Sequence, residues 1–237
     1  MKVYLLRHGE TEWNVQRRVQ GALDSPLTEN GIQQAKNAAE RLANVEFDAA
    51  FASPSPRAYR TAQIIAEPHK GLAIQKENSL REFSFGVYEG HSLDNMHVEC
   101  PELWGQFETT PSLVTSPGGD CMVARVAESR RFVEKLTAQY MHKQILCVSH
   151  GFGVCYFLSA ALGIPLEHSH KFASGNTALT IIEFLAPDRP LVRTFGDTSH
   201  KQTIWDCEEF KNEIYWSVTE KRNGMSCAAY KAAWMRR

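Results

Sequence analysis

The sequence has neither an excess of charge of one sign nor a long apolar run. Lys and Arg number 26 against 27 Asp and Glu, so the formal net charge is −1. A protein that binds polyanions normally carries a basic patch or stripe, and this balance gives no sign of one. No stretch approaches the roughly eighteen uninterrupted apolar residues of a membrane-spanning helix. We therefore expect neither nucleic acid nor a membrane among the partners.

Signals for export and for cysteine-based sites are also missing. The apolar run after Lys2 spans only residues 3–6, which is too short for the core of a signal peptide. The six cysteines include no C-x-x-C pair, so they indicate reduced thiols in a cytoplasmic protein rather than a disulfide framework. His168 and His170 form an H-x-H pair, but no Cys or carboxylate cluster accompanies them, so we expect no metal site.

What the sequence does contain is an alternation of short apolar runs and helical periods. With 237 residues and a hydrophobic fraction of 43%, the chain can bury a sizeable core. The alternation favours an α/β fold: a three-layer sandwich with a mostly parallel central sheet and helices on both faces. The patterns predict strands at residues 2–6, 47–52, 144–148, 177–185 and 191–195, and helices at residues 29–43, 58–66, 123–140 and 151–162.

Two segments depart from this alternation. Residues 86–119 contain three prolines and show no clear period, so we expect an irregular lid insertion of short helices and loops. Residues 206–237 combine aromatic side chains with a basic end, and we expect a C-terminal extension whose role the sequence does not reveal. The remaining chain, residues 1–205, is predicted to form one domain.

Two histidines that are each followed by glycine stand at the ends of predicted strands. Arg7 and His8 follow the first strand, and His150 and Gly151 follow another, which is where an open α/β sheet places its ligand crevice. Arginine presents five donors that match phosphate oxygens. A neutral imidazole can attack phosphorus through its lone pair. Either segment alone is more often structural, but two of them in one sheet indicate a shared site.

Two further segments carry groups suited to phosphate chemistry. Arg57 stands at the start of a predicted helix, and helix N-termini attract anions. Glu82 and Glu89 lie near aromatic residues, where desolvation raises the pKa of a carboxyl group and suits it to act as a general acid. We prefer Glu82, although periodicity does not separate the two.

The ordered set of motifs resembles the histidine phosphatase superfamily, which contains the cofactor-dependent phosphoglycerate mutases. The resemblance covers residues 2–200 and rests on motifs at residues 7–14, 20–21, 27–31, 53–62, 82–90 and 149–151. In this family the histidine of the Arg-His-Gly motif becomes phosphorylated, which implies His8 as the nucleophile. The resemblance further implies Glu82 as the proton donor, with Arg7, Arg57 and His150 as the other catalytic residues.

The same resemblance implies how the substrate is held. Phosphate contacts are expected from seven motif residues: Arg7, Asn14, Gln20, Gly21, Arg57, His150 and Gly151. The two arginines and a protonated His150 would stabilise the charge on the equatorial oxygens of the transferred group. Three cations around one phosphoryl group do electrostatically what Mg²⁺ does elsewhere, so we expect no metal ion and no other cofactor.

Hydrolysis and mutase activity are the two main possibilities, and the sequence favours hydrolysis. After Glu82 the mutases typically have Arg-His-Tyr-Gly, whereas this chain has the phosphatase-like Phe83-Ser84-Phe85-Gly86. Residues 117–120, Pro-Gly-Gly-Asp, resemble the Pro-Gly-Gly-Glu of the phosphatase branch. Residues 86–119 contain no Lys or Arg to hold a second phosphate. We therefore expect a phosphomonoester hydrolase, with a cofactor-dependent phosphoglycerate mutase as the alternative.

A third possibility is a phospho-ligand-binding module that has lost catalysis, but none of the core motif residues is replaced. The expected substrate is a small phosphorylated metabolite, which the sequence does not identify further. Trp104, Phe107 and Leu113 suggest an apolar rim around it. No pattern indicates the oligomeric state, so a monomer and a homodimer both stay open.

Overall fold

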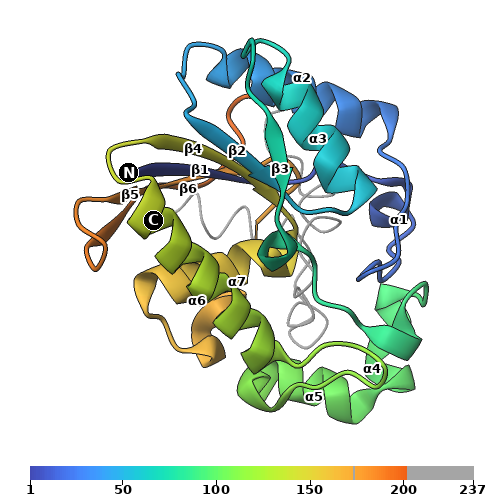
Figure 1. The fold of residues 1–237 in the computed structure, drawn as a ribbon. Coiled ribbons are helices and arrows are strands. Elements are labelled where there is room, and N and C mark those ends of the chain that lie inside the picture. Colours follow the sequence, from blue (N-terminus) through green and yellow to red (C-terminus); the bar gives the residue numbers. More distant parts are fainter. Residues whose placement is uncertain (173, 202–237) are drawn as a thin grey trace, which may run out of the picture.

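The computed structural model describes residues 1–172 and 174–201, which form a six-stranded sheet covered by helices (Figure 1). The strands are β1 (Lys2–Arg7), β2 (Ala49–Ala52), β3 (Ile74–Lys76), β4 (Gln144–Ser149), β5 (Leu179–Phe184) and β6 (Pro190–Asp197). The α-helices are α1 (Glu12–Val15), α2 (Glu29–Leu42), α3 (Pro56–Ala66), α4 (Met96–Glu99), α5 (Pro101–Thr109), α6 (Met122–Gln139) and α7 (Gly151–Leu162). The 3₁₀ turns are η1 (Asn78–Leu80), η2 (Gly86–Tyr88), η3 (Leu93–Asn95), η4 (Pro111–Leu113) and η5 (Leu166–Phe172).

The strands lie in the order β3-β2-β4-β1-β5-β6, and those from β3 to β1 are parallel. β5 and β6 continue the sheet as antiparallel strands. The register pairs Arg7 of β1 with Ser149 of β4, and Ala52 of β2 with Val148 of β4. These three neighbouring strands therefore end at one edge of the sheet, and the residues that follow them are brought together there.

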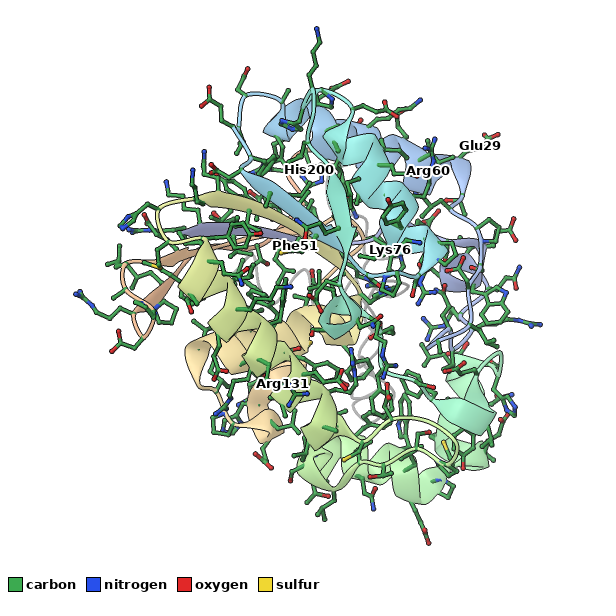
Figure 2. All side chains as sticks on the ribbon, in the orientation of Figure 1. Glu29, Phe51, Arg60, Lys76, Arg131 and His200 are labelled. Atoms are coloured by element: carbon green, nitrogen blue, oxygen red, sulfur yellow. The ribbon has the colours of Figure 1, made fainter. Side chains whose placement is uncertain are left out.

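Helices cover both faces of the sheet: α2 and α3 lie on one side, and α6 and α7 on the other (Figure 1). Small residues such as Ala58 and Ala62 let α3 pack closely against its face. On the other face Phe51 contacts Phe132 of α6, with ring centroids 5.3 Å apart. Figure 2 shows Phe51 at the sheet, whereas the exposed Arg131 projects from α6. Because both faces are covered, the central strands are continuous apolar runs.

The insertion, residues 86–119, contains α4, α5 and 3₁₀ turns, and lies beyond one end of α6 in Figure 1. It closes an aromatic cluster whose members contact one another at centroid distances from 5.1 to 5.9 Å. The rings of this cluster belong to Phe83, Phe85, Phe107 and Phe152. Trp104 and Phe107 are buried in the insertion's core, whereas Leu113 is 65% exposed. The apolar rim predicted from these residues is therefore wrong, because two of the three stabilise the insertion itself.

The predicted fold class is confirmed, and the predicted element boundaries fall within two residues of the observed ones. Two elements were not predicted, the four-residue helix α1 and the three-residue edge strand β3, because neither is long enough to show a period. Of the helices in the described part of the chain, none is long and apolar enough to cross a bilayer. The predicted C-terminal extension, residues 206–237, lies outside the described residues.

Candidate active site

Three adjacent strand ends bring the predicted catalytic side chains together. His8 follows β1, His150 follows β4, and Arg57 is the second residue of α3, the helix after β2. Arg7 is the last residue of β1. None of these four side chains belongs to a residue that is more than 2% exposed. Two guanidinium groups and two imidazole rings are thus enclosed at one edge of the sheet, where charges act strongly on one another.

The ring of His8 is held by its own neighbour. Its Nδ1 lies 2.7 Å from the carbonyl oxygen of Gly9. A carbonyl oxygen only accepts, so this contact assigns the hydrogen to Nδ1 and the lone pair to Nε2. Burial lowers the pKa of His8 well below its ordinary value, and the charges of Arg57 and Arg7 lower it further. His8 is therefore a neutral imidazole with a fixed ring and an unprotonated Nε2.

The ring of His150 lies beside that of His8, with centroids 5.1 Å apart and the planes edge-on. Its Nε2 is 2.7 Å from Oγ of Ser53, and its buried Nδ1 has no hydrogen-bond partner within the described residues. Burial lowers the pKa of His150 well below its ordinary value, and the neighbouring Arg57, His8 and Arg7 add to this shift. The structure thus does not support a permanently protonated His150. Only a nearby anion, such as a phosphoryl group, would favour its cationic form.

Backbone carbonyls orient the two guanidinium groups. Arg57 donates from Nη1 to the Leu23 carbonyl and to Oδ1 of Asp24, both at 2.8 Å, and from Nη2 to the Gly21 carbonyl at 2.9 Å. Arg7 likewise donates from Nη1 to a backbone carbonyl at 2.8 Å. Carbonyl groups position a guanidinium without neutralising it, and the side chain of Asp24 is 28% exposed to solvent. Arg57 is ion-paired with this one carboxylate, so the two guanidinium groups together still carry more positive charge than Asp24 offsets, which suits an anionic ligand.

Glu82 is the buried carboxyl group of this site, at 4% exposure. Its Oε1 accepts hydrogen bonds from the backbone N–H groups of Phe83 and Phe152, both at 3.0 Å. Burial raises the pKa of Glu82, whereas these two hydrogen bonds and the nearby arginines oppose the shift. The net effect is a raised pKa, which favours the protonated form that a general acid needs. Glu89, the alternative acid, instead accepts four hydrogen bonds from turns around it.

The remaining predicted phosphate ligands make contacts within the protein. Oδ1 of Asn14 accepts from the N–H and Oγ1 of Thr11, at 3.1 and 2.9 Å, in the capping box of α1. Nε2 of Gln20 donates to the same Oγ1 at 2.9 Å. Gly21 offers its carbonyl to the guanidinium described above, and Gly151 begins α7. Direct contacts from these four residues to phosphate therefore stay a prediction.

Two polar residues of the site were not predicted. Asn176 is 2% exposed, and its Nδ2 donates to the His8 carbonyl at 2.9 Å and to Oδ1 of Asn14 at 3.4 Å. The N–H of Thr177 donates to the Arg7 carbonyl at 3.1 Å, from a residue with φ of 53°. The available signal was this polar pair next to a predicted strand, but an ordinary turn has the same appearance.

The Pro-Gly-Gly-Asp motif supports Glu82 through its neighbours in the chain. Asp120 forms a two-pronged ion pair with Arg81, at 2.9 and 2.8 Å, and accepts a hydrogen bond from the N–H of Ser84 at 2.8 Å. Arg81 and Ser84 flank Glu82 on its two sides. The motif was predicted only as a marker of the phosphatase branch, and these bonds give it a structural reason.

The whole arrangement combines a neutral imidazole, a second imidazole, two guanidinium groups and one buried carboxyl group whose pKa is raised. Within residues 1–172 and 174–201, no three His, Cys, Asp or Glu side chains gather as the ligands of a metal ion would. The set matches the requirements of phosphoryl transfer, which needs a nucleophile, positive charge around the transferred group and a proton for the leaving oxygen.

Known proteins share this architecture. Residues 3–198 match the family described as "Histidine phosphatase superfamily (branch 1)". A relative from Proteus mirabilis (strain HI4320), named "Probable phosphoglycerate mutase GpmB", is 33% identical over 212 residues, which are 86% of this chain and 96% of that one. The solved structure "Bacillus stearothermophilus YhfR" superposes with a TM-score of 0.77 at 33% identity, and the match covers 84% of this chain and 98% of that chain.

A phosphoserine phosphatase mutant from Entamoeba histolytica, solved in complex with phosphoserine, superposes with a TM-score of 0.75 at 32% identity. That match covers 84% of this chain and 98% of the phosphatase. The relatives thus include proteins named as phosphatases and as mutases, and the family match extends from the first strand to the last described one. The chain belongs to branch 1 of the histidine phosphatase superfamily.

Proposed function

We propose that the protein hydrolyses phosphate monoesters through a phosphohistidine intermediate on His8. The observation that carries this proposal is a buried imidazole with a fixed ring and a buried carboxyl group, whose pKa values are shifted in opposite directions. His8 is neutral, with Nδ1 bound to the Gly9 carbonyl, whereas burial raises the pKa of Glu82 and favours its protonated form. A buried base whose pKa is lowered beside a buried acid whose pKa is raised is the pattern expected of a paired nucleophile and proton donor, because perturbed pKa values cluster at functional sites.

In the first step Nε2 of His8 attacks phosphorus in line, and the bond from phosphorus to the ester oxygen breaks. Glu82 gives its proton to that oxygen, so the leaving group departs as a neutral alcohol. The Gly9 carbonyl accepts a stronger hydrogen bond from Nδ1 as the ring becomes positive. The products of this step are phosphohistidine, an alcohol and the carboxylate of Glu82.

In the second step water attacks phosphorus, Glu82 takes a proton from that water, and the phosphorus–nitrogen bond breaks. His8 returns to its neutral form and inorganic phosphate is released. Arg7 and Arg57 stabilise the equatorial oxygens in both steps. His150 joins them, because the negative charge of a bound phosphoryl group would offset the burial and the cations that lower its pKa. Because these side chains supply the positive charge, we propose that the reaction needs no metal ion.

Hydrolysis rather than mutase activity is supported by the charge of the insertion. Residues 86–119 contain no Lys or Arg. Arg17 reaches the insertion from outside it, but it is paired with Asp94 at 2.7 Å. A mutase must retain a bisphosphorylated intermediate, whose second phosphate calls for further basic groups. The mutase reading remains the second candidate because a relative carries that name.

The proposed substrate is a small phosphorylated metabolite, and the proposed location is the cytoplasm. Phosphoserine is one candidate, since it is the ligand of a similar phosphatase structure. The four cysteines of the described residues are free thiols, which agrees with a reducing compartment. The proposed chemistry requires only a phosphate monoester whose leaving oxygen can reach Glu82.

The test is phosphate release from p-nitrophenyl phosphate, phosphoserine and 3-phosphoglycerate in the presence of EDTA. We expect hydrolysis that survives chelation, and a phosphoenzyme that is trapped by rapid quenching and labelled on His8. Interconversion of 2- and 3-phosphoglycerate with a bisphosphorylated primer, without net hydrolysis, would instead identify a mutase. The absence of activity in both assays, combined with tight phosphate binding, would identify a binding module.

A further inference from the structure

Glu89 is a carboxylate that joins two segments of the site without belonging to the proposed chemistry. It follows the 3₁₀ turn η2, at the start of the insertion. Its oxygens accept four hydrogen bonds, from the N–H groups of Ala22 and Leu23 at 2.8 and 3.1 Å, and from Oγ of Ser84 and N–H of Phe85 at 2.9 and 3.0 Å. One charged group therefore holds two backbone turns that are more than sixty residues apart in the chain.

The first of these turns is the one that orients Arg57. The carbonyl of Gly21 accepts from Nη2 of Arg57 at 2.9 Å, and the N–H of Ala22 in the same peptide unit donates to Glu89. Leu23 adds a second link through two successive peptide units, with its N–H on Glu89 at 3.1 Å and its carbonyl on Nη1 of Arg57 at 2.8 Å. The Gly21–Ala22 peptide group thus lies directly between the carboxylate and the guanidinium, so that the hydrogen bonds at its two ends polarise each other.

Gly21 permits this close arrangement. Its φ is 57°, a backbone conformation that residues with a side chain rarely adopt. A Cβ added there would lie 2.7 Å from the carboxyl carbon of Glu89. The turn and the carboxylate are therefore in direct contact, and the space between them admits no side chain.

The second turn follows the proposed proton donor. Ser84 and Phe85 stand two and three residues after Glu82, and the N–H of Ser84 is bonded to Asp120. With both its N–H and its hydroxyl engaged, Ser84 is held from two sides. Glu89 therefore ties the segment that carries Glu82 to the turn that aims Arg57.

We propose that Glu89 is a positioning residue that sets the orientation of the Arg57 guanidinium, and hence the affinity of the site for a phosphoryl group, through the turn at residues 21–23. This inference rests on the proposed function of the site. The oxygens of Glu89 are already engaged by four donors from the two turns, so we assign Glu89 no part in the proton transfer.

The first test is Glu89→Gln, which keeps the shape of the side chain and removes its charge. The control is Glu102→Gln, which removes an exposed carboxylate from α5 of the same insertion. We expect the dissociation constant of inorganic phosphate, measured by isothermal titration calorimetry, to rise about tenfold in Glu89→Gln, as for one weakened charge-assisted hydrogen bond. KM for p-nitrophenyl phosphate should rise in parallel, while the control leaves both values unchanged.

The second test is a double-mutant cycle with Arg57→Lys, read as kcat/KM. If Glu89 acts through Arg57, Glu89→Gln should cost less than about threefold in the Arg57→Lys background, because the group it positions is gone. Gly21→Ala provides an independent route to the same loss of phosphate affinity. Additive losses in the cycle would overturn the proposal. A Glu89→Gln protein with unchanged phosphate affinity and a shifted alkaline limb of the pH–rate profile would also overturn the proposal, since Glu89 would then act on proton transfer.

The behaviour of the wild-type protein shows whether a negative result contradicts the proposed function or only the role of Glu89. A wild-type protein that neither hydrolyses esters nor binds phosphate would contradict the function. A wild-type protein that does both, with Glu89→Gln folded and equal to wild type in phosphate affinity, would contradict only the role of Glu89.

Discussion

Two regions of the molecule contribute to the site in different ways. The edge formed by β1, β2 and β4 carries His8, Arg57 and His150 directly after regular strands or at the start of a helix. The insertion contributes short helices and 3₁₀ turns that pack around an aromatic cluster. Glu82 links the two regions, since its hydrogen-bond donors Phe83 and Phe152 belong to the aromatic cluster, and Phe152 also lies in α7, the helix that follows β4 and His150.

We expect the two regions to act on different parts of the substrate, the sheet edge on the phosphoryl group and the insertion on the remainder. The sheet edge holds the two arginines and the proposed nucleophile, and we expect these to act on the phosphoryl group that all phosphate monoesters share. The insertion has no Lys or Arg and follows Glu82 in the chain, so we expect it to contact the part of the substrate that varies between esters. We expect changes at the sheet edge to reduce activity on every substrate alike. Changes to the buried core of the insertion should alter the ranking of substrates, whereas changes at its exposed positions should leave the ranking as it is.

The largest expected effect is that of His8→Ala. Loss of the nucleophile should reduce kcat/KM by at least about 10⁴-fold on every ester, because a unit of cooperating groups loses its reacting atom. Phosphate release and trapping of the phosphoenzyme measure this effect. His97→Ala, which removes an exposed histidine of α4, is the matched control and should retain full activity. Appreciable turnover by His8→Ala would refute the assignment.

Glu82→Gln should have a smaller and selective effect. Removal of a general acid typically costs about 10²- to 10⁴-fold, and the loss is greatest where the leaving oxygen most needs a proton. We expect a large loss for alkyl phosphates and a slight one for p-nitrophenyl phosphate, whose leaving group is stable as an anion. Equal losses on both esters, compared as kcat/KM ratios, would place the acid elsewhere.

Phe107→Ala should act on the insertion rather than on the chemistry. Phe107 is 1% exposed and contacts three rings at 5.7 Å, so its loss should lower the free energy of unfolding by about 3–5 kcal/mol. Leu113→Ala, at a position 65% exposed, should change it by less than about 0.5 kcal/mol. Denaturant titration measures both values. A changed order of preferred substrates in Phe107→Ala, with an unchanged order in Leu113→Ala, would support the expected division of roles between the sheet edge and the insertion.

The smallest expected effect is a loss of stability in mild acid. Burial holds the pKa of His8 and of His150 below their unfolded values, so the unfolded chain takes up protons first as pH falls. The stabilising effect of keeping these groups neutral is complete above the unfolded pKa and is lost as pH falls towards the folded pKa. Each histidine contributes a slope of at most about 1.4 kcal/mol per pH unit below about pH 6.5. Thermal midpoints that are flat from pH 7 to pH 5 would contradict this.

Local pattern was sufficient to predict the layers of the fold and the strand ends that carry chemistry. The apolar runs of β1 and β4 are readable because both faces of these strands are buried, and the period of α2 is readable because one face of that helix is buried. The edge strand β3 has one apolar residue in three, and its other two residues are exposed, so its sequence shows no strand pattern. Asn176 was missed because its partner His8 is 168 residues away.

The sequence by itself determined the α/β class, the order of the motifs and the residue types available for phosphoryl transfer. The protonation, orientation and burial of these groups depend on the folded structure. In it His150 is neutral, and carbonyl groups of residues 21 and 23 orient Arg57. Glu89 holds a turn, whereas Glu82 is buried. The reason is physical. Periodicity reports which faces are buried along one element, whereas protonation and orientation depend on desolvation and on hydrogen bonds between segments that only the folded chain brings into contact.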